Sequence, residues 1–269
     1  MGMQPDMTGF DPTVPHPARM QNYVLGGKDH FAADREAADK RLQVLPDWGI
    51  GARESRYFLG RTVRHLAAEC GIRQFVDIGP GLPAVGSTHE VAQVVAPQSR
   101  VVYVDNDPMV IAHARALLTS AAAGAFSCIE ADLGDPERLV AEVAATGTLD
   151  FGQPVAVLLV AVMHFIPQSA DPAGIVRTLV DALVPGSYVV ISHLTRDYDH
   201  DRVSKSMKVG ADVGIPVRSV TFEEFTGYFD GLDMIDPGAV LISEWRRDIP
   251  GPPPLPTQIN FYGAVARKP

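Results

Sequence analysis

The N-terminal quarter of the chain is patterned for helices that follow an extended arm. Residues 1–20 hold four prolines and few apolar side chains, which predicts an extended or disordered arm. Apolar residues then recur at helical spacing and predict helices over 34–41 and 53–70. The apolar face of the second helix consists of Leu59, Val63, Leu66 and Cys70. Gly71 supplies its end, so we expect this helix to lie flat on a larger body.

After Gly71 the pattern changes to short apolar, β-branched runs that alternate with helical ones. Five of these runs predict strands, at 74–78, 100–104, 125–130, 155–160 and 187–192. Helical patterns fall between them, at 89–95, 108–120, 137–145 and 172–183. Continuous apolar strands separated by helices are typical of a sheet that is buried on both faces, which is mainly parallel and doubly wound.

Capping residues support the predicted helix starts. Asp107 precedes Pro108 and Asp171 precedes Pro172, which places an N-cap acceptor ahead of a proline in the first turn. Thr221 with Glu224 forms the pattern of a capping box, which predicts a helix over 222–229.

Two further strands are predicted near the C-terminus, at 239–245 and 260–266. A proline-rich loop without a helical pattern joins them, and a parallel connection normally needs a crossover helix. We therefore expect them to pair antiparallel at one sheet edge. The sequence predicts an α/β fold with a doubly wound, seven-stranded sheet. It divides into an N-terminal arm and helical lid at 1–72 and a core at 73–269.

Composition and charge restrict the class of protein. The chain has 269 residues, a net charge of −9, 46% hydrophobic and 20% charged residues, which excludes a disordered or fibrous protein. An acidic balance repels phosphate backbones, so we expect no nucleic-acid partner. The two cysteines sit in apolar runs, and no signal peptide or membrane-spanning stretch is apparent, so we expect a cytoplasmic protein. The oligomeric state is open.

Polar residues follow each predicted parallel strand, where open α/β sheets bind their ligands. The first strand ends in Asp77-x-Gly79-x-Gly81, and the second ends at Asp105, with Asn106 beside it. Asp105 lies 24 residues beyond Gly81, a spacing at which an acid reaches ribose hydroxyls. The remaining strand ends carry Asp132-Leu133, His164 and His193.

Each of these signals is weak alone, since a glycine pair or an aspartate at a strand end is often a plain turn. Gly79-x-Gly81-x-x-Ala84 also matches the dinucleotide pattern. The joint placement of these glycines and aspartates at the ends of successive strands favours a nucleoside-bearing ligand. Asp77 would oppose a pyrophosphate at this loop, whereas S-adenosylmethionine has no phosphate and carries a sulfonium and an amino group. The acidic loop therefore favours S-adenosylmethionine over a nicotinamide dinucleotide.

The same residues resemble the motifs of class I S-adenosylmethionine-dependent methyltransferases. Asp77-x-Gly79-x-Gly81 corresponds to the first motif, Asp105 to the second and Asp132-Leu133 to the third, while Pro83 stands where the usual loop has its last glycine. Longer strings resemble one actinobacterial family of such methyltransferases, first catalogued as a domain of unknown function. They include YVLGGKDHFAADREAAD (23–39), FVDIGPGLPAVGSTHEVAQ (75–93), VVYVDNDPMVIAHARALL (101–118), VAVLLVAVMHFIP (155–167) and PGSYVVISHLT (185–195). The resemblance implies a class I fold that binds S-adenosylmethionine, with no settled acceptor.

Within that resemblance, two N-terminal segments are candidates for cofactor binding. Gly26 and Gly27 would form a close-packed lid, with Tyr23 stacking or hydrogen bonding and Lys28 near the methionine carboxylate. The alternative is a helix-entry turn with a solvated lysine. Arg56 lies in a stretch similar to one in which an arginine holds the cofactor's carboxylate, and the alternative is a solvated helix face.

His164 and His193 are the candidate catalytic residues. Both follow strands that would face the acceptor, and a histidine can serve as a base where the acceptor must lose a proton, although either could be a wall residue. Ala161-Val162-Met163-His164 differs from the Asn-Pro-Pro-Tyr type of loop, which argues against base N-methylation and favours a small-molecule acceptor.

Two alternative functions and one question about a segment of the chain stay open at this point. One is an S-adenosylmethionine-binding protein without catalysis, and another is an NAD(P)-dependent oxidoreductase, against which Asp77 argues. The question concerns residues 196–218, which form either a lid over the acceptor or a surface excursion.

Overall fold

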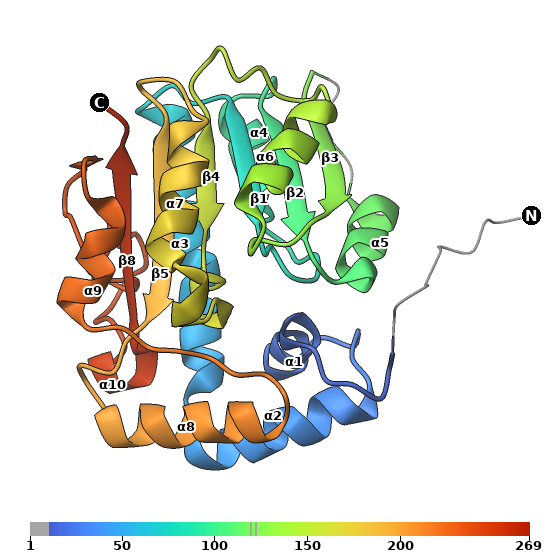
Figure 1. The fold of residues 1–269 in the computed structure, drawn as a ribbon, viewed down its shortest axis with the longest axis vertical. Helices are drawn as coiled ribbons and strands as arrows, with labels where there is room; N and C mark the ends of the chain where they lie inside the picture. The colour runs from blue at the N-terminus through green and yellow to red at the C-terminus, as the bar shows by residue number, and fades with distance from the viewer. Residues whose placement is uncertain (1–10, 119, 122) are drawn as a thin grey trace, which may run out of the picture.

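The protein is built around one mixed sheet, shown in Figure 1. The computed structural model describes residues 11–118, 120–121 and 123–269. The strands of this part are β1 (Gln74–Ile78), β2 (Arg100–Asp105), β3 (Ala125–Glu130), β4 (Ala156–Leu159), β5 (Tyr188–Leu194), β6 (Asp233–Met234), β7 (Val240–Leu241) and β8 (Phe261–Arg267). Their order is β3-β2-β1-β4-β5-β8-β6, and β7 also pairs with β8. The first five strands are parallel and β8 is antiparallel to β5, which confirms the predicted doubly wound sheet with an antiparallel last strand.

Helices cover both faces of the sheet because each presents an apolar stripe to it. One face packs against α6 (Pro136–Ala145), α7 (Pro172–Asp181) and α9 (Phe222–Thr226). The other packs against α3 (Trp48–Ala68), α4 (Thr88–Val95) and α5 (Pro108–Leu117). Leu59, Val63 and Leu66 are buried in the second layer, which confirms the predicted stripe on α3.

The predicted helix starts are confirmed. The Asp107 carboxylate accepts a hydrogen bond from the Met109 N–H at 2.9 Å and caps α5. Asp171 likewise accepts from the Gly174 N–H at 3.1 Å at the start of α7. At α9, Thr221 Oγ1 accepts from the Glu224 N–H at 3.2 Å, while the Glu224 carboxylate accepts from the Thr221 N–H at 2.7 Å.

The proline-rich arm is not extended throughout. Residues 17–24 form α1 (Pro17–Val24), because the prolines end at position 17, where a proline suits the first helical turn. Buried Arg19 and Asp34 join α1 to α2 (Ala32–Val44) through an ion pair of 3.2 Å between Nε and Oδ1. The prediction of an extended arm was therefore wrong for 17–20, and residues 1–10 lie outside the described part.

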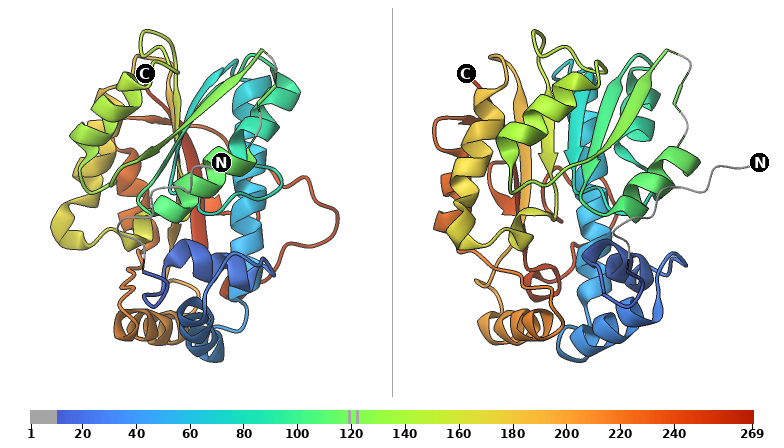
Figure 2. Two further views of the ribbon diagram at one scale, coloured as in Figure 1. Left: turned by 90° about the vertical axis from the view of Figure 1, so that its right-hand side faces the viewer. Right: turned by 45° about the vertical axis from the view of Figure 1, so that its right-hand side comes forward.

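Residues 196–218 contain a helix that the sequence pattern did not reveal, α8 (His200–Asp212). It packs beside α2, although the two are far apart in the sequence. Figures 1 and 2 show α1, α2 and α8 together at the end of the molecule where the parallel strands finish. These helices form a covering layer over the carboxyl ends of the sheet.

The second sheet edge departs from the prediction. Only Val240–Leu241 of the expected strand 239–245 is extended, and a turn follows. The buried Arg61 guanidinium donates to the carbonyls of Ile242 and Trp245, at 2.5 and 2.9 Å, so these groups pair with a side chain instead of a strand. The edge is completed by β6. The connection to β8, predicted without a helix, holds α10 (Pro256–Ile259).

Short 3₁₀ turns complete the secondary structure of the described residues. They are η1 (Met163–Phe165), η2 (Gln168–Ala170) and η3 (Gly227–Phe229). Among the helices described, none is both long and apolar enough to cross a membrane.

Candidate active site

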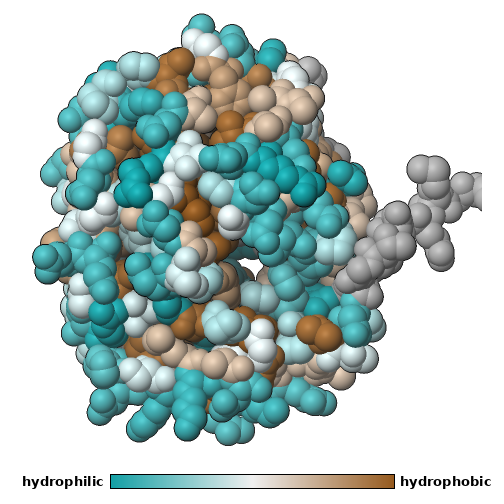
Figure 3. All heavy atoms as spheres, viewed as in Figure 1, coloured by the Kyte–Doolittle hydropathy of each residue, from teal (hydrophilic) through white to brown (hydrophobic). Residues whose placement is uncertain are grey.

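A cavity of about 510 Å³ lies between the carboxyl ends of the parallel strands and α1. Its volume falls within the range of about 300–1,000 Å³ that is typical of small-molecule sites. Figure 3 shows a hollow at this level, between the sheet and the helices below it. The predicted site residues that line this cavity are Arg56, Asp77, Gly79, Gly81, Asp105, Asn106, Asp132 and Leu133. We call it the cofactor cavity.

The glycine loop after β1 brings bare backbone to the cavity wall. Gly79 and Gly81 have φ angles of +71° and +67°, in the left-handed region that favours glycine. A Cβ on Gly79 would lie 2.6 Å from Cγ2 of Val162, so a side chain there would collide with the loop after β4. The loop therefore needs glycine at this position to keep the wall in place.

Asp105 at the end of β2 holds this loop. Its Oδ2 accepts a hydrogen bond from the Gly81 N–H at 3.2 Å, and its Oδ1 accepts from the Asp107 N–H at 3.0 Å. Burial raises the pKa of Asp105 to about 6. Next to it, Asn106 is exposed at the cavity rim. Asp105 thus presents a fixed carboxylate on which ligand hydroxyls can dock.

Asp77 and Arg56 give the cavity a second polar region. The Asp77 carboxylate accepts a hydrogen bond from Thr88 Oγ1 at 2.6 Å. Burial raises the pKa of Asp77 to about 6, although Thr88 and the positive charge of Arg56 oppose the rise. The Arg56 guanidinium donates to the Leu82 carbonyl at 3.1 Å. A carboxylate and a guanidinium in one region suit a ligand that carries both an amino and a carboxylate group.

Beyond β3, Asp132 is exposed and Leu133 is buried, and both line the cofactor cavity. Asp132 Oδ1 accepts a hydrogen bond from the Gly134 N–H at 2.8 Å, which fixes the turn that leads to α6. The buried Leu133 makes this part of the wall apolar, so an aromatic ring could pack against it.

The structure does not bring Tyr23, Gly26, Gly27 or Lys28 into the lining of the cofactor cavity. The Tyr23 hydroxyl donates to Asp39 Oδ1 at 3.0 Å, Gly27 packs against the side chain of Asn22, and Lys28 is exposed. The cover comes from the preceding residues instead, namely Pro15, His16, Pro17, Ala18 and Gln21. Sequence reasoning missed these residues because the proline-rich stretch predicted an extended arm. His16 followed by Pro17 is a helix start, and it was the signal that could have predicted α1.

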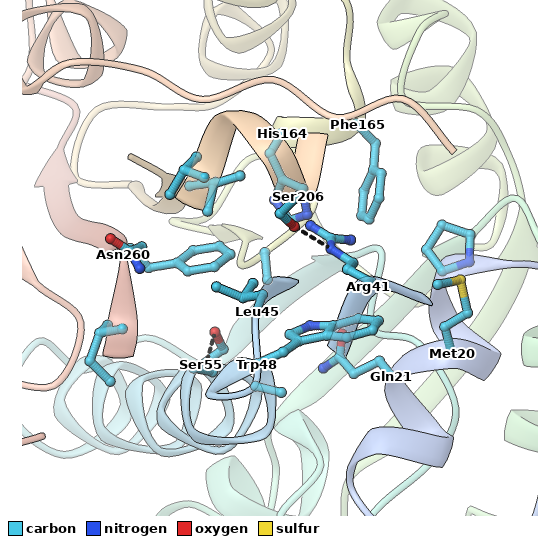
Figure 4. Close-up of a pocket in the computed structure, with 18 of the residues that line it drawn as sticks. Met20, Gln21, Arg41, Leu45, Trp48, Ser55, His164, Phe165, Ser206 and Asn260 are labelled. Carbon is cyan, nitrogen blue, oxygen red and sulfur yellow. Dashed lines mark hydrogen bonds between the residues drawn. The ribbon is translucent and has the colours of Figure 1, made fainter. Parts of the chain in front are cut away.

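A smaller cavity of about 50 Å³ adjoins the first. The two share wall residues, which are Pro17, Gln21, Ser55, Ala161, Phe165 and Ile215. We call it the inner chamber, and Figure 4 shows its lining from α1, α2, α3, η1 and α8. Its contribution from α8 shows that residues 196–218 build the site and are more than a surface excursion.

The two histidines are placed differently. His164 lines the inner chamber, where burial holds its pKa well below the usual value, and its buried Nδ1 has no hydrogen-bond partner. His193 lines neither cavity of the site. Its ring stacks on Tyr228, and burial lowers its pKa to about 3. His193 therefore lies behind His164, at 6.2 Å between ring centroids, as a wall residue of the core.

Comparison with known proteins shows the family to which the chain belongs. A family model described as S-adenosyl methyltransferase matches residues 3–269. The chain belongs to this family. Among solved structures, a DUF574 family protein of Streptomyces avermitilis is 40% identical, with a TM-score of 0.92 over 96% of this chain and 99% of the other. A candidate methyltransferase from Thermobifida fusca is 36% identical, with a TM-score of 0.88 over 100% and 99% of the two chains.

A more distant likeness concerns the fold alone. An O-methyltransferase family 2 protein of Planctomyces limnophilus is 15% identical, with a TM-score of 0.50 over 88% of this chain and 66% of the other. Among curated proteins none matches this chain. The protein is thus a class I methyltransferase of the S-adenosyl methyltransferase family. This confirms the predicted family, fold class and cofactor.

The residues of the cofactor cavity fit S-adenosylmethionine. Asp105 offers a carboxylate to hydroxyls, Leu133 an apolar wall, and Asp77 with Arg56 complementary charges for an amino acid group. The bound cofactor supplies a methyl group on a sulfonium that is already a good leaving group. The chain's own residues then have to bind, orient and exclude water.

We expect cofactor affinity to depend on pH. Burial raises the pKa of both Asp77 and Asp105 to about 6, so each carboxyl becomes protonated as the pH falls through 6. The protonated forms lose their negative charge, which should weaken binding of S-adenosylhomocysteine between pH 7.5 and pH 5. Calorimetric titrations at both pH values test this, with Asp105→Asn as the variant whose dependence should be flatter. Equal affinity at the two pH values would contradict the expectation.

Proposed function

We propose that this methyltransferase transfers the methyl group of S-adenosylmethionine to an oxygen or nitrogen atom of a small-molecule acceptor. One observation carries the proposal: an inner chamber of about 50 Å³ adjoins the cofactor cavity, and the two share wall residues. An acceptor reaching from the chamber toward the cofactor cavity would meet the methyl group at that boundary. The net charge of −9 disfavours nucleic acid as the acceptor.

The proposed cofactor contacts follow from the cavity lining. Asp105 would accept the ribose hydroxyls, with Asn106 beside it at the rim, and Asp132 and Leu133 would border the adenine. Gly79 and Gly81 let the backbone approach the cofactor, while Asp77 and Arg56 would bind its amino and carboxylate groups. In this proposal residues 73–269 form the core that binds the cofactor. Residues 1–72 supply the cover of the cavity and one helix that packs against that core.

His164 is the proposed catalytic residue. Its neutral ring carries one donor and one acceptor nitrogen, and its low pKa makes it a hydrogen-bonding partner of the acceptor more than a strong base. Transfer of a methyl group from a sulfonium to an acceptor atom depends mainly on alignment of the acceptor atom with the methyl carbon and the sulfur. We therefore assign His164 to orienting the acceptor and receiving its proton where one is lost.

We place the protein in the cytoplasm, in line with its cysteine usage.

Replacing His164 by glutamine tests this role. We expect turnover to fall at least tenfold, because a misplacement of about 1 Å between reacting groups can cost about 10²-fold in rate. Affinity for S-adenosylhomocysteine should stay within twofold, because His164 is absent from the cofactor cavity wall. The measurement is transfer of labelled methyl groups across a panel of phenols, alcohols, amines and amino acids. His200→Gln, at an exposed position on α8, is the matched control.

Two outcomes would count against the proposal. If the wild-type protein binds S-adenosylhomocysteine but methylates no small molecule while methylating protein or RNA, the acceptor class is wrong. If His164→Gln turns over as fast as the wild-type protein, the assignment of His164 is wrong.

A further inference from the structure

The inner chamber contains a buried positive charge. Arg41 on α2 is only 7% exposed, and it is the one Lys, Arg, Asp or Glu side chain in the chamber wall that the structure describes. Its Nε donates to Ser206 Oγ at 3.0 Å, and its guanidinium carbon lies 4.8 Å from the centroid of the Trp48 ring. Figure 4 shows Arg41, Ser206 and Trp48 around the chamber, with His164 above the guanidinium.

No carboxylate of the described residues forms an ion pair with Arg41. Among the described residues its hydrogen-bond partner is a neutral hydroxyl, that of Ser206, and burial alone accounts for its lowered pKa. Other buried arginines differ: Arg19 pairs with Asp34 at 3.2 Å, and Arg61 donates to two backbone carbonyls. A buried charge without a counter-charge is costly, and a bound ligand with a negative charge would offset that cost.

The neighbouring groups cannot supply the missing negative charge. His164 is neutral, since burial above all, and also the neighbouring His193 and Arg41, hold its pKa well below the usual value. Burial lowers the pKa of Arg41 only to about 10, so it stays a cation at neutral pH. An anion from outside the chain is the remaining way to balance the charge.

We propose that the acceptor of this methyltransferase carries a carboxylate, and that Arg41 binds this carboxylate in the inner chamber. The inference rests on the proposed function and names the substrate class for the same site. A single guanidinium balances one negative charge and forms two parallel hydrogen bonds to a carboxylate. A phosphate dianion would leave a second charge without a partner in this wall, which favours the carboxylate.

The volume of the chamber sets how much of the acceptor enters it. At about 50 Å³ it is well below the roughly 150 Å³ of a cavity that binds benzene, so it admits the carboxylate end and a short stem. The rest of the acceptor then lies across the shared wall, toward the cofactor cavity. In this arrangement the carboxylate is the anchor, and the atom that is methylated sits at the boundary between the two cavities.

The test compares a carboxylate with its uncharged counterpart. Wild-type protein is saturated with S-adenosylhomocysteine and titrated calorimetrically with butanoate and with butanamide, which have similar shapes. We expect butanoate to bind at least tenfold more tightly. Arg41→Met should abolish this preference, and Arg41→Lys should retain part of it, because lysine keeps the charge and loses the planar fork. Lys40→Met, which removes an exposed cation from the same helix, should leave the preference intact.

Affinity for S-adenosylhomocysteine separates this inference from its rival, in which Arg41 holds the carboxylate of the cofactor itself. We expect Arg41→Met to change that affinity less than twofold and Arg56→Met to weaken it at least fivefold, because only Arg56 lines the cofactor cavity. The reverse pattern would overturn the inference. So would equal binding of butanoate and butanamide by the wild-type protein, a result that needs no variant to fold. Failure of the wild-type protein to bind S-adenosylhomocysteine would instead overturn the proposed function.

Discussion

Asp105→Ala is expected to weaken binding of S-adenosylhomocysteine by at least tenfold. The Asp105 carboxylate lines the cofactor cavity, where it would accept two ribose hydroxyls. Each charge-assisted hydrogen bond contributes about 1.5–3 kcal/mol, and about 1.4 kcal/mol corresponds to a factor of ten in affinity. The loop should also loosen, because the Gly81 N–H loses the carboxylate that accepts its hydrogen bond at 3.2 Å. Calorimetry at pH 7.5, where the carboxyl is ionised, gives the affinity.

Asp181→Ala is the matched control for this variant. Asp181 is exposed at the end of α7 and lies outside both cavities of the site, so its removal should leave the affinity unchanged. Thermal unfolding without ligand checks that Asp105→Ala is folded. A folded Asp105→Ala protein with wild-type affinity would show that another residue binds the ribose.

Asp34→Ala is expected to lower the free energy of unfolding by about 3 kcal/mol, because loss of one partner of a buried ion pair costs about 3–5 kcal/mol. Asp34 is fully buried and joins α1 to α2. Its carboxylate accepts from Arg19 Nε at 3.2 Å, the His16 N–H at 2.9 Å and the Phe31 N–H at 2.8 Å. Since α1 covers the cofactor cavity, affinity for S-adenosylhomocysteine should fall as well.

Chemical denaturation measures the stability change, with Glu36→Ala as the control at an exposed position of the same helix. Asp34→Asn should fall between the two, because an amide oxygen can still accept a hydrogen bond while the charge is lost. Wild-type stability and cofactor affinity in Asp34→Ala would show that α1 is held by its apolar contacts alone, such as those of Met20.

The sequence determined the parallel part of the sheet almost to the residue. The runs at 74–78, 100–104 and 125–130 became β1, β2 and β3 because an apolar, β-branched run of this length has few other ways to be buried. The sequence also predicted that Asp77, Gly81 and Asp105 meet, since the carboxyl ends of neighbouring parallel strands share one edge. These are local patterns combined with one topological rule, and they sufficed for the wall that the strand ends contribute to the cofactor cavity.

Only the tertiary structure decided what covers that cavity and what lines the inner chamber. The Arg41–Ser206 hydrogen bond joins residues 165 positions apart, on α2 and α8, and neither residue belongs to a motif. Their apolar neighbours are spread over several elements, so no short window of sequence carries the signal. The strand predicted at 239–245 pairs antiparallel with β8 as expected but ends at Leu241, because the distant Arg61 binds the carbonyls of Ile242 and Trp245. Long-range pairing of buried polar groups is settled by packing, which a local pattern does not contain.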